Sequence, residues 1–120
     1  EGSLSNMKKY ISILDGIVAG EGNGPKAPDA INAGYIIAGS NPVSVDVVCA
    51  RMMNFDYTKI PSIRNAFQIS CFPLVDFNME DIKIVFKGVI YSLSNFPSSF
   101  VVSFKPAQGW VEHIELDNKY

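Results

Sequence analysis

The fold of this chain is decided by residues 36–46, IIAGSNPVSVD, which join an apolar strand pattern to the start of a helix. A short strand is expected over residues 33–39. Ser40 and Asn41 are both good N-cap residues, and Pro42 suits the first helical position, where its missing N–H costs no hydrogen bond. We therefore expect a helix over residues 42–53.

Upstream of this stretch, residues 10–19 are rich in β-branched side chains, which predicts a strand. This strand pattern is followed by glycine, proline and asparagine over residues 20–29. Such a composition predicts a loop about ten residues long.

Downstream of the first helix, Asn54 suits a left-handed C-terminal cap. Apolar residues then recur at helical spacing, which predicts a second helix over residues 61–70. Short β-like runs follow at residues 82–86, 88–93, 100–104 and 110–116. The chain is therefore expected to be a single domain over residues 1–120 of α/β or α+β class. It would hold a mixed β-sheet, two central helices and an antiparallel β extension at the C-terminal end.

Composition excludes several classes of protein. Hydrophobic residues make up 48% of the 120 residues and charged residues 18%, which is not the composition of a disordered chain. A formal charge of −2 argues against a nucleic-acid partner. No apolar run reaches the roughly 20 residues needed to cross a bilayer, so no membrane partner is expected. The only two cysteines, Cys49 and Cys71, are too far apart for a C-x-x-C motif, which favours a reduced, cytoplasmic protein.

Asp46 is the candidate catalytic residue. On a helical wheel it falls among the apolar side chains of the helix, whereas Ser44 and Arg51 lie together on the other side. We therefore expect its side chain to point inward, where a carboxylate must be paired, hydrogen-bonded or protonated. Two interpretations stay open: a structural carboxylate that accepts backbone N–H groups, or a site carboxylate that binds a metal ion or acts as a general base.

The candidate metal ligands are Asp15, Glu21 and Asp46. If the glycine-rich loop folds back over the start of the helix, the three carboxylates would offer the oxygen ligands that a divalent cation such as Mg²⁺ prefers. The spacing does not require this convergence, because Asp15 before a glycine is also ordinary turn chemistry.

The candidate ligand-binding residues are Glu21, Gly22, Asn23 and Gly24. Backbone N–H groups of this loop, or those at the start of the helix at Pro42, are potential donors to a small anionic ligand. The segment matches neither the G-x-G-x-x-G pattern nor a P-loop. An ordered structural loop is therefore the alternative.

The remaining reactive side chains do not indicate a catalytic centre. Cys49 is expected in the core, and Cys71 has no neighbouring cation to lower the pKa of its thiol. His113 is the only histidine and cannot form a zinc site alone, so a surface or interface position is expected.

Several motifs occur together in an order that resembles a known family. They are residues 15–18 (DGIV), 21–25 (EGNGP), 36–46, 51–53 (RMM) and 60–61 (IP). Together they resemble the C-terminal part of the uncharacterised family called domain of unknown function 362, over about residues 10–70, and residues 109–115 resemble a segment near the end of some longer members. The chain departs from the family pattern at Asn41, where aspartate is usual, at Asn54, where glycine is usual, and at residues 70–72, where a Gly-Leu-Gly turn is usual.

The resemblance implies that the chain is the C-terminal fragment of a longer protein, whose missing N-terminal part is then its expected partner. Many relatives carry ferredoxin-type clusters bound by four cysteines. Cys49 and Cys71 do not match them, so no iron–sulfur cluster is expected within this chain.

Two hypotheses about function follow, and the sequence does not decide whether the chain is an enzyme. The first is a small-ligand or metal-binding half-site built from the glycine-rich loop and acidic residues. The second is a non-enzymatic accessory or redox-partner scaffold of an iron–sulfur-associated protein. An open cleft lined by residues 20–25 with an exposed Asp46 favours the first, whereas a sealed, hydrogen-bonded Asp46 favours the second.

Overall fold

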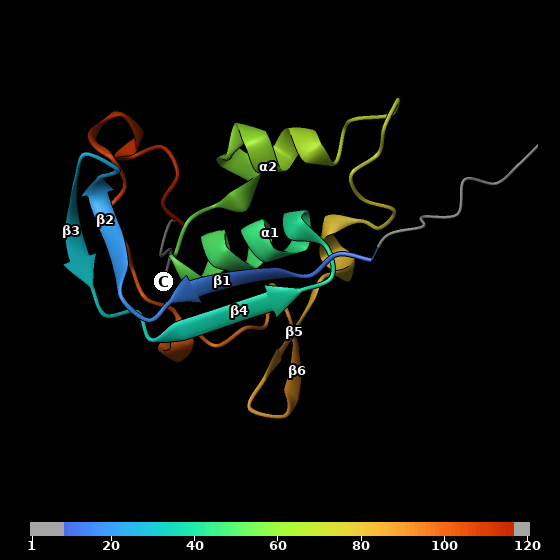
Figure 1. The fold of residues 1–120 in the computed structure, drawn as a ribbon, viewed down its shortest axis with the longest axis horizontal. Coiled ribbons are helices and arrows are strands. Elements are labelled where there is room, and N and C mark those ends of the chain that lie inside the picture. Colours follow the sequence, from blue (N-terminus) through green and yellow to red (C-terminus); the bar gives the residue numbers. More distant parts are fainter. Residues whose placement is uncertain (1–8, 117–120) are drawn as a thin grey trace, which may run out of the picture.

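The computed structural model describes residues 9–116. Helices and antiparallel strands both occur, which confirms the expected α+β class (Figure 1). The strands are β1 (Ser12–Gly16), β2 (Ala19–Asn23), β3 (Ala27–Ile31), β4 (Tyr35–Gly39), β5 (Lys83–Phe86) and β6 (Val89–Ser92). The α-helices are α1 (Pro42–Met52) and α2 (Pro61–Ala66), and the short 3-10 helices are η1 (Tyr57–Lys59), η2 (Met79–Asp81), η3 (Ser98–Phe100) and η4 (Gln108–Trp110).

Within the described residues the strands form three separate two-stranded sheets, each antiparallel: β1 with β4, β2 with β3, and β5 with β6. The sequence predicted one mixed sheet instead. The difference arises because β2 and β5 each pair with the strand that follows them along the chain, and β4 and β5 do not pair with each other.

The predicted ten-residue loop is replaced by the β2–β3 hairpin, which pairs Glu21 with Asp29. The predicted strand over residues 10–19 is interrupted at residues 17–18, so it supplies β1 and the start of β2. Two glycines meet local requirements of this hairpin. A Cβ atom on Gly20 would lie 2.9 Å from the Cβ of Pro28, and Gly22 has a φ of +75°.

Helix α1 begins and ends close to the predicted positions. The Asn41 side chain caps it by accepting the backbone N–H groups of Val43 and Ser44, at 2.9 and 3.2 Å. Asn54 has the left-handed conformation expected after the helix, with a φ of 64°. Helix α2 ends at Ala66, short of the predicted residue 70. In the part of the chain that the structure describes, no helix has the length and apolar character needed to cross a membrane.

The predicted strands over residues 100–104 and 110–116 are wrong. Residues 101–107 form no strand, and residues 111–116 contribute one isolated bridge, between Phe55 and Glu115. Their backbone groups bond instead to the end of α1 and the turn that follows it. The N–H of Val102 donates to the Met52 carbonyl at 2.9 Å, and that of Phe104 to the Met53 carbonyl at 3.1 Å. We call residues 101–116 the C-terminal segment.

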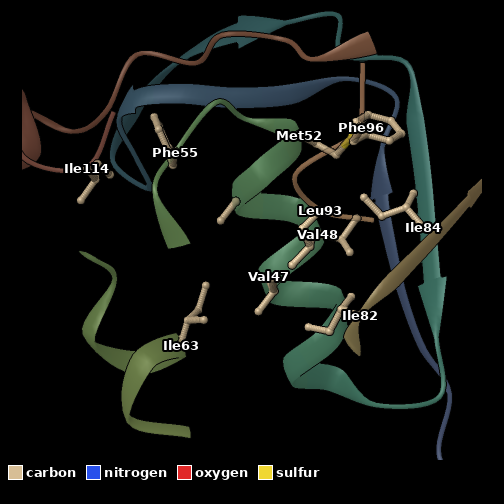
Figure 2. Close-up of a cluster of buried hydrophobic side chains, with 11 residues drawn as sticks. Val47, Val48, Met52, Phe55, Ile63, Ile82, Ile84, Leu93, Phe96 and Ile114 are labelled. Carbon is tan, nitrogen blue, oxygen red and sulfur yellow. The ribbon is translucent and has the colours of Figure 1, made fainter. Parts of the chain in front are cut away.

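Helix α1 lies at the centre of the core, and side chains from α2, β5 and the C-terminal segment gather around it (Figure 2). Val47 has no exposed surface at all. Phe55, Ile63 and Ile114 extend the core on the side of α2. Because α1 contributes side chains in nearly every direction, it is the element against which both surface cavities are built.

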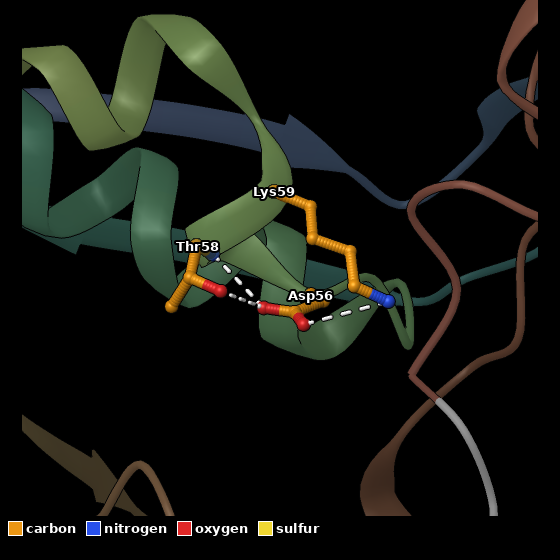
Figure 3. A network of polar contacts seen from close by, with 3 residues as sticks. All are labelled: Asp56, Thr58 and Lys59. Carbon is orange, nitrogen blue, oxygen red and sulfur yellow. Dashed lines mark hydrogen bonds and ion pairs between the residues drawn. The ribbon is translucent and has the colours of Figure 1, made fainter.

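The connection from α1 to α2 is fixed by Asp56. Its Oδ1 accepts the backbone N–H of Thr58 at 3.0 Å and the Thr58 hydroxyl at 2.6 Å, and its Oδ2 lies 3.7 Å from the Lys59 Nζ (Figure 3). This capped turn is η1, and α2 begins two residues after it. The start of α2 is thereby held beside the α1 residues that form the candidate site.

Candidate functional site

A surface cleft of about 370 Å³ lies where α1 faces β2, the start of α2 and the C-terminal segment. Much of its wall is apolar, including Phe55, Ile63, Phe104 and Trp110. Trp110 is 43% exposed, which is unusual for a side chain of this size. We call this cavity the ligand cleft.

Asp46 lines the ligand cleft but does not point into a closed interior, so the predicted inward orientation is wrong. The helical wheel placed it correctly beside Cys49, Ala50 and Met53, since all three line the same cleft. That face of α1 borders an open cavity rather than the sealed core, which is why the side chain is exposed. Among residues 9–116, the ion pairs are Lys59–Asp56 and Lys105–Glu21, so the carboxylate of Asp46 has no cationic partner there.

Cys49 is half-buried and lies one helical turn from Asp46. Burial, with a smaller contribution from the neighbouring Asp46 charge, raises the pKa of its thiol to about 11. The thiol is therefore protonated at neutral pH and is not a nucleophile.

Glu21 reaches the ligand cleft, but its carboxylate is occupied. Its Oε2 accepts the backbone N–H of Lys105 at 2.8 Å, and its Oε1 lies 3.4 Å from the Lys105 Nζ. The hydrogen bond from the Lys105 backbone holds the pKa of Glu21 below its ordinary value of 4.5, and the lysine side chain adds to this effect. The carboxylate therefore neutralises Lys105 and fixes the C-terminal segment against β2.

The other predicted loop ligands make the same kind of internal contact. The N–H of Gly22 donates to the Lys105 carbonyl at 2.9 Å, and the Asn23 Oδ1 accepts the Gln108 N–H at 3.1 Å. The N–H of Gly24 donates to the Gly22 carbonyl. Residues 21–23 thus bind residues 105–108 of the same chain, and their hydrogen-bonding groups are not free to surround an anion. Asn41 likewise occupies the first N–H groups of α1.

The three carboxylates proposed as metal ligands are not brought together. Asp15 lies on β1 opposite Ile36, where its Oδ1 accepts the N–H of Ile17 at 3.2 Å. It does not line the ligand cleft, whereas Glu21 and Asp46 do. Over the part of the chain that is described, no group of three histidine, cysteine or acidic side chains is placed to hold a metal ion.

The C-terminal segment supplies site residues that sequence patterns did not single out. Phe104, Lys105 and Trp110 all line the ligand cleft, 50 or more positions from α1 along the chain. Lys105 carried no motif, and Trp110 was noted only within a predicted strand and within residues 109–115, which resemble a segment of longer family members. Cys71 and His113 are exposed and lie outside the cleft.

Comparison with known proteins gives one family match. Residues 3–51 match the model of a family described as a domain of unknown function (DUF362). The match contains residues 15–18 and 21–25, β4 and all but the last residue of α1, and it ends before α2 and the C-terminal segment. No curated protein matches the chain, and no solved structure does either.

Proposed function

We propose a function from the geometry of the ligand cleft, because the family that residues 3–51 match is described only as a domain of unknown function and its description names no activity. The cleft binds a small organic molecule with an apolar, preferably aromatic, body and a cationic or hydrogen-bond-donating end. The observation that carries this proposal is the exposed Asp46 carboxylate at the edge of an otherwise mainly apolar cleft.

The size and lining of the cleft support this class of ligand. A cavity of about 370 Å³ lies within the range typical of small-molecule sites, which is roughly 300–1,000 Å³. Such sites are lined by hydrophobic and aromatic side chains with few polar groups that set orientation. Trp110 offers a ring face on which a flat ligand can stack, with an energy of about 1 kcal/mol beyond simple burial.

The charges around the cleft favour a donor over an anion. Lys105 is the only cation that lines the cleft within the described residues, and Glu21 already neutralises it. Asp46 has no such partner, so an anion would be repelled and an ammonium or guanidinium group attracted. The small anionic ligand that the sequence suggested is therefore not proposed.

The same geometry favours binding over covalent catalysis. The pKa of the Cys49 thiol, at about 11, leaves it protonated beside Asp46. A protonated thiol contributes packing surface and a weak donor, not an attacking group.

Phenethylamine is a suitable probe, because it joins an aromatic ring to an ammonium group. Binding is measured by two-dimensional NMR of the 120-residue chain, following backbone amides of α1 and residues 104–110. We expect saturable shifts at residues around Asp46, and weaker shifts with 2-phenylethanol, which has the same ring and no charge. A charge-assisted hydrogen bond is worth about 1.5–3 kcal/mol, so Asp46→Asn is expected to weaken phenethylamine binding roughly tenfold or more.

Asp76→Asn is the matched control, since Asp76 is exposed and lines neither cavity. It removes the same charge from the molecule and is expected to leave binding unchanged. Equal loss of affinity in Asp46→Asn and Asp76→Asn would mean that only overall charge matters. Absence of saturable shifts around the cleft would contradict the proposed function directly.

A further inference from the structure

One wall of the ligand cleft is a loop whose two ends are both attached near the end of α1. At its start, the Phe104 N–H donates to the Met53 carbonyl at 3.1 Å. At its end, the Ile114 carbonyl accepts the Asp56 N–H at 2.6 Å. We call residues 105–113, which lie between these attachments, the cleft loop. Surface loops of roughly 6–16 residues with ends close together are often functional.

The cleft loop presents several side chains to the cleft as one unit. Those that line the cleft are Lys105, Pro106, Ala107 and Trp110. Turns within the loop order it internally, because the Trp110 N–H donates to the Ala107 carbonyl at 2.7 Å and the His113 N–H to the Trp110 carbonyl at 3.1 Å. A displacement of the loop would therefore remove the aromatic wall and its neighbours from the cleft together.

The middle of the cleft loop is held by β2. The contacts of residues 21–23 with residues 105–108, described above, join the two segments, and we call them the latch. Among the described residues, no other hydrogen bond joins residues 105–108 to a part of the chain outside the loop. Figure 1 shows η4, in red, beside the end of β2. The loop is thus attached to α1 at its ends and to β2 in its middle.

Asn23 takes part in the latch from outside the cleft. Its Oδ1 accepts the Gln108 N–H at 3.1 Å, yet Asn23 does not line the cleft, whereas Glu21 and Gly22 do. The Asn23 side chain carries no charge, so its removal changes neither the lining of the cleft nor the charge around it. Any effect of Asn23 on a ligand in the cleft must therefore act through the position of the cleft loop.

We infer that Asn23 and Glu21 are positioning residues, which hold the cleft loop where it completes the ligand cleft, so that ligand affinity depends on the latch. The inference rests on the proposed function and assigns a means of control to the same site. Apparent affinity falls in proportion to the fraction of molecules in which the binding-competent arrangement is present. By linkage, a ligand that contacts the loop stabilises the latch by the same factor.

Asn23→Ala tests the latch, with Asn32→Ala as the matched control. Asn32 is exposed between β3 and β4, lines neither cavity, and has no side-chain hydrogen bond among the described residues. The Kd values of phenethylamine and 2-phenylethanol are measured by NMR titration of the 120-residue chain. Asn23→Ala should raise both Kd values by about threefold or more, since the loop wall serves both ligands, and Asn32→Ala should change neither.

Glu21→Ala distinguishes a positioning role from direct contact with the ligand. Glu21 lines the cleft and is charged, so a direct contact would favour the ammonium group of phenethylamine alone. The variant also removes both contacts with Lys105. A positioning role predicts weaker binding of both ligands, whereas weaker binding of phenethylamine alone would contradict that role for Glu21.

Amide hydrogen exchange at Lys105 reports on the latch without a ligand. The acceptor of the Lys105 N–H is Glu21, which Asn23→Ala leaves in place, so faster exchange at Lys105 in this variant would show release of the loop as a whole. We expect exchange there to quicken by about threefold or more in Asn23→Ala, and to slow in the wild-type chain when phenethylamine is added. Acrylamide quenching of Trp110, the only tryptophan, should increase in the same variant.

The outcomes separate this inference from the proposed function. If the wild-type chain binds neither ligand, the proposed function fails and the inference fails with it. If the wild-type chain binds phenethylamine and Asn23→Ala binds it equally well, the inference alone is overturned. It is also overturned if phenethylamine binds the wild-type chain without slowing exchange at Lys105, a result that needs no variant to fold.

Discussion

The Asn41 side chain makes two kinds of contact, a cap on α1 and a hydrogen bond to Leu74, and two substitutions can separate their contributions to stability. The Asn41 Oδ1 accepts the N–H groups of Val43 and Ser44, and its Nδ2 donates to the Leu74 carbonyl at 2.9 Å. Loss of an N-cap side chain costs about 1 kcal/mol, and loss of an exposed hydrogen bond about 0.5 kcal/mol. Asn41→Ala should therefore lower the free energy of unfolding by about 1.5 kcal/mol, which corresponds to about 6 °C in Tm for a domain of this size.

Asn41→Asp keeps the capping oxygen and places a negative charge at the start of α1, which stabilises it by about 0.5 kcal/mol. It also removes the donor to Leu74, so the net change is expected to be near zero. Ser40→Ala is the control, because Ser40 is the other residue that the sequence offers as a cap and no hydrogen bond of its side chain is present among the described residues. Thermal unfolding at pH 7, followed by circular dichroism, compares the three variants. The reasoning is refuted if Asn41→Ala unfolds with the wild-type chain, or if Asn41→Asp falls as far as Asn41→Ala.

Three further predictions concern the core and the ligand cleft. Val47→Ala removes two methyl groups from a side chain with no exposed surface and should cost about 2–3 kcal/mol, seen as a lower urea midpoint with an unchanged slope; a shift below about 1 kcal/mol would show that the site collapses around the smaller residue. The pKa of Glu21 is lowered in the folded chain, so the stabilising effect of its carboxylate is present above pH 4.5 and is lost as the pH falls through the folded value. The free energy of unfolding of Glu21→Gln should therefore be lower than that of the wild type at pH 7, and the two should converge below pH 4.5. A difference that stays constant with pH would contradict the assigned ion pair. With a thiol pKa of about 11, Cys49 is about one-thousandth thiolate at pH 8, so iodoacetamide should label the exposed Cys71 first, as mass spectrometry of peptides would reveal; Cys49 labelled as fast as Cys71 would contradict its burial.

The parts of the fold that follow from neighbouring residues could be predicted from the sequence. The β4 strand, the cap at Asn41 and the start of α1 depend on side chains within a few positions of one another, and local rules cover such cases. The β2–β3 hairpin was missed because glycine and proline lower the strand signal of residues 19–31. Backbone pairing within the hairpin, and its contacts with residues 105–108, outweigh that composition in the folded chain.

The C-terminal segment was misassigned for a related reason. Its alternating side chains resemble strands, yet its N–H groups bond to carbonyls at the end of α1, about 50 residues away. Nothing in residues 100–116 alone indicates that partner. The Glu21 carboxylate is bound by Lys105 of the same segment. The sequence does not show that these two residues meet, so it could not reveal that the carboxylate is occupied and not free for a ligand.

The case of Asp46 shows how a correct face can give a wrong environment. A helical wheel gives the direction in which each side chain leaves the helix axis. It placed Asp46 on the same side as Cys49 and Met53, and in the structure all three line the same cleft. Whether that direction is dry depends on what covers it. Here residues 104–107 line the cleft beside Asp46 but leave its side chain exposed.

Helix α1 separates two cavities, since Val45 and Val48 line a cavity between β4 and β5 whereas Asp46 and Cys49 line the ligand cleft. The two sets alternate along the same two turns of helix, with Val47 buried between them. A change at Val47 would therefore disturb both cavities and could not assign a function to either. Asp46→Asn alters a residue that lines the ligand cleft and not the other cavity, so loss of phenethylamine binding in this variant with an unchanged Tm would assign the effect to the cleft.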